Sequence, residues 1–64
     1  MTELIKIWLT NMYEENIEET KGAISNERLW AKAATSTEEE EMHMNNIANM
    51  EEYIEVLKEK IAEL

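Results

Sequence analysis

The chain contains no cysteine, no proline and no aspartate, and its 64 residues include a single glycine, Gly22. Without cysteine, neither a disulfide nor a thiolate zinc site can supplement the core. Without proline and with one glycine, the usual residues of tight turns are nearly missing. Because strand-like alternation of apolar and polar residues is also missing, the composition predicts an all-α protein.

Basic residues are scarce as well: six lysines and arginines stand against fifteen acidic residues, for a formal charge of −9. This balance argues against non-specific nucleic-acid binding, which needs cations to replace phosphate counterions. Imitation of DNA by the acidic surface is an alternative, but a solvated helix surface rich in glutamate is the simpler interpretation. No apolar run reaches the ~18 residues of a membrane span. The opening MTELIKIWL lacks the pattern of a secretory signal, so we expect a cytosolic protein.

Two helices are predicted, over residues 2–34 and 37–64, within one domain spanning 1–64. Thr2 is suited to cap the first helix, and we expect that helix to continue through Gly22, although a kink there is the alternative. Small residues in AATSTEEEE predict the turn at 34–37. Ser36 followed by Glu39 forms a capping-box pattern, with Thr35 and Glu38 as the competing register.

The second predicted helix carries apolar residues at alternating three- and four-residue spacing, as in a coiled coil. A short connection makes the two helices antiparallel neighbours, so the fold class is an antiparallel helical hairpin. Its seam is predicted to contain Ile17, Ile24, Ile47, Met50, Ile54, Leu57 and Ile61.

The first helix is apolar over a wider surface near its start than one partner helix can cover. A chain this short is also near the lower limit for a self-sufficient core. We therefore expect self-association into a four-helix bundle or a larger helical oligomer, with docking of a foreign protein as the alternative. The predicted interface consists of Ile5, Trp8, Leu9, Met12 and Tyr13.

Folding the hairpin brings the chain's least common side chains to its loop end. An aromatic ring, a planar cation and several amides there are groups that bind a small anionic, nucleotide-like ligand. The candidate ligand-binding residues are Asn26, Arg28, Trp30, His43, Asn45 and Asn46. The alternative is ordinary packing, in which the asparagines fix the helix register and Arg28 pairs with nearby glutamates.

A metal site is a third hypothesis for the loop end. Glu40 and His43 have the i, i+3 spacing of di-iron helical bundles, and Glu27 faces them from the first helix, so two hairpins could assemble a two-metal site. No cofactor is expected otherwise. Catalysis is not expected, because the chain has one histidine, no cysteine and no glycine-rich phosphate loop.

A very short, acidic chain rich in Lys, Glu, Asn and Ile is typical of a phage or mobile-element gene of a low-GC bacterium. We therefore expect a non-enzymatic binding protein that inhibits a host protein by stoichiometric binding. Sequestration of a small anionic ligand at the loop end is the second hypothesis, and the metal site the third.

Overall fold

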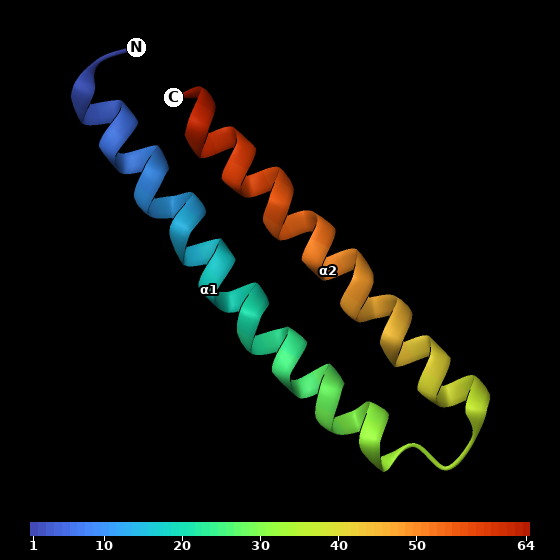
Figure 1. Ribbon diagram of the computed structural model, residues 1–64. Helices are drawn as coiled ribbons and strands as arrows, with labels where there is room; N and C mark the ends of the chain where they lie inside the picture. The colour runs from blue at the N-terminus through green and yellow to red at the C-terminus, as the bar shows by residue number, and fades with distance from the viewer.

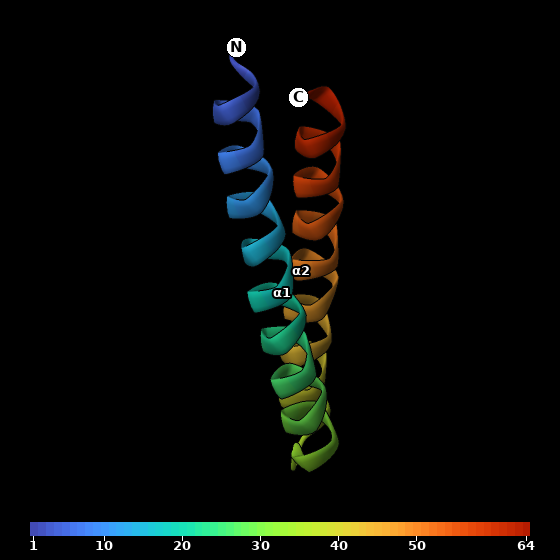
Figure 2. The ribbon, with the colours of Figure 1, turned by 90° about the vertical axis from the view of Figure 1, so that its left-hand side faces the viewer.

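Two long helices account for nearly all of the chain in a computed structural model that describes residues 1–64. Helix α1 spans Glu3–Ala33 and helix α2 spans Thr37–Glu63. The helices lie side by side and antiparallel, which confirms the all-helical hairpin (Figures 1 and 2). Both termini lie at one end, called here the open end, and the connection between the helices lies at the loop end (Figure 1). The Cα trace measures 51 × 15 × 9 Å.

Helix α1 begins at a side-chain cap and continues without a break. The Thr2 Oγ1 atom accepts a hydrogen bond from the Ile5 amide at 3.3 Å, which satisfies one of the free donors of the first turn. Gly22 lies inside the helix with no positive φ angle, so the predicted continuity is confirmed. A Cβ atom built at Gly22 would meet nothing within 4 Å.

The start of α2 follows the Ser36 and Glu39 register rather than the Thr35 and Glu38 register. The Ser36 Oγ atom accepts from the Glu39 amide at 3.1 Å. The Glu39 carboxylate reaches back and accepts from both the amide and the hydroxyl of Thr35 at 3.3 Å. This pair of reciprocal contacts stabilises the turn and directs the chain into α2. The structural helix ends differ from the predicted ranges by one residue at three of four positions.

The core is a single row of apolar side chains between the helices. Its five buried residues are Ile17, Ile24, Ile47, Ile54 and Leu57. Tyr13, Met50 and Ile61 are partly buried and pack against this row. No side chain in the molecule is fully enclosed, because two helices alone cannot surround one.

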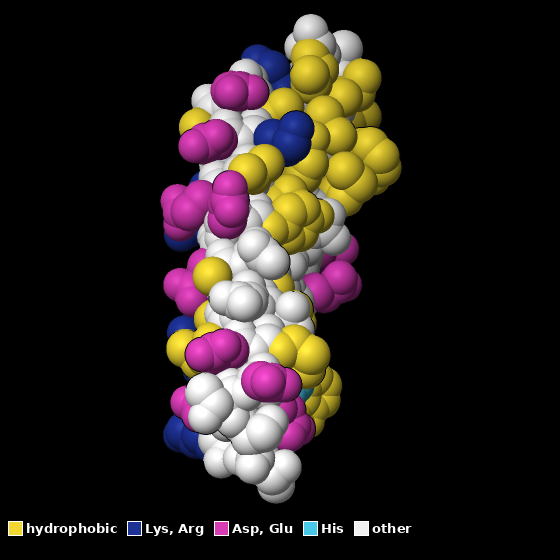
Figure 3. Space-filling model, turned by 90° about the vertical axis from the view of Figure 1, so that its right-hand side faces the viewer, with side chains coloured by type: hydrophobic (Ala, Val, Ile, Leu, Met, Phe, Trp, Pro, Cys, Tyr) yellow, Lys and Arg dark blue, Asp and Glu magenta, His cyan; other side chains and the backbone are white.

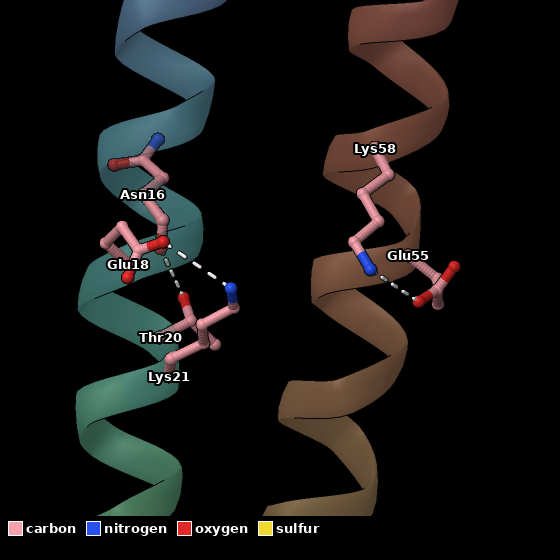
Figure 4. A network of polar contacts seen from close by, with 6 residues as sticks. All are labelled: Asn16, Glu18, Thr20, Lys21, Glu55 and Lys58. Carbon is pink, nitrogen blue, oxygen red and sulfur yellow. Dashed lines mark hydrogen bonds and ion pairs between the residues drawn. The ribbon is translucent and has the colours of Figure 1, made fainter.

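The middle of the hairpin has one polar contact between the helices, the exposed ion pair of Arg28 and Glu51 at 4.0 Å. Two other ion pairs stay within one helix: Lys21 with Glu18 and, nearer the open end, Lys58 with Glu55, each at 3.4 Å (Figure 4). The half-buried Thr20 donates its hydroxyl to the Asn16 carbonyl at 2.7 Å, so it needs no partner on α2 (Figure 4). Because an exposed ion pair contributes little, apolar packing supplies most of the attraction between the helices in this part of the hairpin.

Neither helix combines the length and the apolar character that crossing a membrane requires.

Candidate functional site

The loop end contains the one buried charged residue of the molecule, Glu27 on α1. Its Oε2 atom lies 2.6 Å from Nδ1 of His43 on α2, and the two side chains are only 10% and 12% exposed. Glu27 follows Ile24 by three residues and therefore continues the buried stripe of α1. The regular helical pattern thus directs a carboxylate into the interhelical space, where it requires a hydrogen-bond partner.

Asn46 supplies a second donor to the same carboxylate. Its Nδ2 atom lies 3.5 Å from Glu27 Oε2, one turn of α2 beyond His43. No buried side-chain nitrogen or oxygen lacks a partner. We call Glu27, His43 and Asn46 the polar cluster. Both hydrogen bonds join α2 to the Glu27 Oε2 atom on α1, so the cluster links the two helices at one fixed register.

Trp30 covers one side of the polar cluster. Its ring centroid lies 5.9 Å from that of His43, with the planes tilted by 48°. The contact shields the imidazole on one side. The indole nevertheless remains 53% exposed. A large aromatic surface therefore stays open next to the cluster.

Arg28 does not join this group. Two residues along a helix rotate by about 200°, so Arg28 and Trp30 lie on opposite flanks of α1. The Arg28 guanidinium is 4.0 Å from the Glu51 carboxylate, and both side chains are more than half exposed. Asn26 and Asn45 are exposed and make no side-chain hydrogen bond.

The six predicted ligand-binding residues are therefore divided by the structure. Trp30, His43 and Asn46 come together around Glu27, whereas Arg28 lies on the opposite flank of α1 from Trp30. Position along the chain predicts all six at one end of the hairpin, but the angle around α1 separates Arg28 from Trp30. The spacing of Glu27 from Ile24 marks it as a seam residue, a role beyond the metal ligation predicted for it.

No three His, Cys, Asp or Glu side chains of one chain are placed to hold a metal ion. Glu40 is exposed, and Glu27 and His43 bond directly to each other. A metal at this end would have to separate that pair and recruit ligands from a second copy. The two-metal hypothesis thus depends on an assembly of hairpins.

The open end carries a different surface. Of the predicted interface residues, Ile5, Trp8 and Met12 are exposed, while Leu9 and Tyr13 are half-buried within the hairpin. Leu4 and Ile7 are exposed too, and a shallow apolar depression is lined by Leu4, Ile5, Ile7, Trp8 and Asn11. Figure 3 shows hydrophobic side chains gathered at this end. The open-end apolar face is defined here as Leu4, Ile5, Ile7, Trp8 and Met12.

Comparison with known proteins returned no matching family model, no matching characterised protein and no matching solved structure.

Proposed function

We propose that this chain is a non-enzymatic binding protein that self-associates into a homo-oligomer of hairpins, a four-helix bundle in its smallest form, and acts by stoichiometric binding. The observation that carries the proposal is the open-end apolar face. Leu4 is 77% exposed, Trp8 64% and Ile7 56%, although all three are large and apolar. A helix that is apolar around most of its circumference is normally covered on most sides.

The polar cluster supports a structural role for its three side chains. His43 and Asn46 on α2 both bond to the Oε2 atom of Glu27 on α1. The cluster has the features of a register-fixing contact between helices.

The first candidate target is a protein of the host cell, bound in the cytosol and blocked one to one, as a phage or mobile-element inhibitor does. The apolar faces supply contact area, and a formal charge of −9 favours a partner with a basic surface. The half-exposed Trp30 and the exposed Leu29, Met42 and Met44 form further apolar area at the loop end.

The second candidate is sequestration of a small anionic, nucleotide-like ligand. The exposed indole of Trp30 and the exposed guanidinium of Arg28 favour it, because they offer stacking and a planar cation. A ligand that touches both must lie between two copies, since the two side chains are on opposite flanks of α1. Sequestration therefore also depends on self-association.

Native mass spectrometry of protein purified without chelators separates the candidates. Whole multiples of the 7.5 kDa chain mass with no excess favour a protein target. Excess mass that corresponds to an organic molecule, absent from Arg28→Ala, favours sequestration. Excess mass of metal ions favours the third hypothesis. A single 7.5 kDa species across all concentrations contradicts the proposed homo-oligomer.

A further inference from the structure

Charge is distributed unevenly along the hairpin. The open end, taken as residues 1–13 and 54–64, has three lysines and four glutamates, for a formal charge of −1. Residues 14–53 have three basic and eleven acidic side chains and carry the remaining −8. At the open end, Lys6 pairs with Glu3 at 3.8 Å and Lys58 with Glu55 at 3.4 Å. Here, two copies can meet with little net repulsion.

The same end offers enough apolar area for a contact. Aromatic side chains cover ~150–250 Å² each, and with the lower value for the four aliphatic residues the exposed fractions of the open-end apolar face amount to roughly 500 Å². Two such faces bury roughly 1,000 Å², near the minimum expected of a specific interface, before polar neighbours are included. The charge balance and the apolar area thus coincide on one part of the surface.

From these two observations we infer that a second copy of this chain covers the open-end apolar face, with the open ends overlapping and the two loop ends pointing away from each other. The inference rests on the self-association proposed above and specifies its geometry. In a single chain the open-end apolar face is uncovered, because the same face of the second copy is what covers it. The result is a short four-helix bundle at the centre of an elongated dimer.

Electrostatics decides between this geometry and two hairpins packed side by side along their full length. Packed helix axes lie about 8–10 Å apart, so charged side chains on facing helices can come closer together than the Debye length of ~8 Å at physiological salt. Full-length packing would therefore place residues 14–53 of the two copies, each with a formal charge of −8, against each other with little screening. Overlap of the open ends leaves these segments several Debye lengths apart over most of their length.

Small-angle X-ray scattering with a mass measurement in the same run tests the geometry. The wild-type chain is expected to show twice the 7.5 kDa chain mass and a maximum dimension well above the 51 Å length of one hairpin, approaching twice that length less the overlap. A dimer no longer than a single hairpin would overturn the inference and leave the proposed self-association standing. A monomer at every concentration would overturn both.

Two leucines on α1 provide matched variants. Leu4 at the open end and Leu29 at the loop end are 77% and 63% exposed, so neither Leu4→Glu nor Leu29→Glu removes a core contact. Leu4→Glu is expected to weaken dimerisation by at least about tenfold, and Leu29→Glu to change it less than about threefold. Circular dichroism checks that both variants remain helical. Equal effects of the two variants, or a larger effect of Leu29→Glu, would show that the open ends are not the contact.

Discussion

The contact between Glu27 and His43 makes the sharpest stability prediction. Replacing His43 with leucine removes the partner at 2.6 Å and leaves a nearly buried carboxylate with only Asn46, at 3.5 Å. Losing one member of a buried pair usually costs about 3–5 kcal/mol. Because Glu27 keeps one donor and lies near solvent, we expect His43→Leu to lower the free energy of unfolding by about 2–3 kcal/mol.

The double variant Glu27→Leu with His43→Leu should recover most of that loss. An apolar pair of similar size needs no desolvation of a charge, and such replacements of buried polar pairs are often neutral or stabilising. The free energy of unfolding of the double variant is therefore expected within about 1 kcal/mol of the wild type. A double-mutant cycle should then give a coupling energy of about 2 kcal/mol between Glu27 and His43. Glu27→Leu completes the cycle, and Asn45→Ala is the control, because Asn45 is exposed and makes no side-chain hydrogen bond.

Thermal unfolding followed by circular dichroism measures these differences. All variants must be compared at one chain concentration and neutral pH, since the stability of an oligomer depends on concentration. For a chain of this size about 1 kcal/mol corresponds to roughly 4–8 °C, so His43→Leu should unfold on the order of 10–20 °C lower. The reasoning is refuted when His43→Leu unfolds within a few degrees of the wild type, or when the double variant loses as much as the two single variants together.

Three smaller predictions follow from the fold. Gly22→Ala should raise the free energy of unfolding by up to about 1 kcal/mol, since the added methyl meets nothing within 4 Å; a lower melting temperature would show that Gly22 is in contact with another copy. Ser36→Ala should lower the free energy of unfolding by about 1 kcal/mol through loss of the α2 cap, while Ser36→Asp retains stability. Arg28→Ala should shift it by less than about 1 kcal/mol, because its 4.0 Å contact with Glu51 is exposed; a larger loss in chemical denaturation would mean that Arg28 has a buried partner in the assembly.

Much of the hairpin follows from local sequence signals. Ile47, Ile54 and Leu57 lie at three- and four-residue spacing, which predicts a helix with one buried stripe, and the structure places all three in the core. Ser36 and Glu39 mark the start of α2 because a cap needs those residue types three positions apart. These features depend on residues three or four positions apart in the chain, so they can be predicted from the sequence.

The loop end was less predictable. Distance along the helix placed Arg28 and Trp30 together, but their angle around α1 separates them. The sequence places Glu27 opposite His43, but the direct bond between them depends on the side-chain rotamers of two helices. Contacts between copies depend on surfaces that a single chain leaves open, so the role of the open-end apolar face stays a prediction.

Self-association through the open-end apolar face is the central claim, and sedimentation equilibrium over a wide range of chain concentrations tests it most directly. The wild type is expected at a whole multiple of 7.5 kDa, Trp8→Glu at the mass of one chain, and the control Trp30→Glu at the wild-type mass. A wild-type mass of one chain at every concentration, or an assembly that Trp8→Glu leaves intact, would contradict the claim.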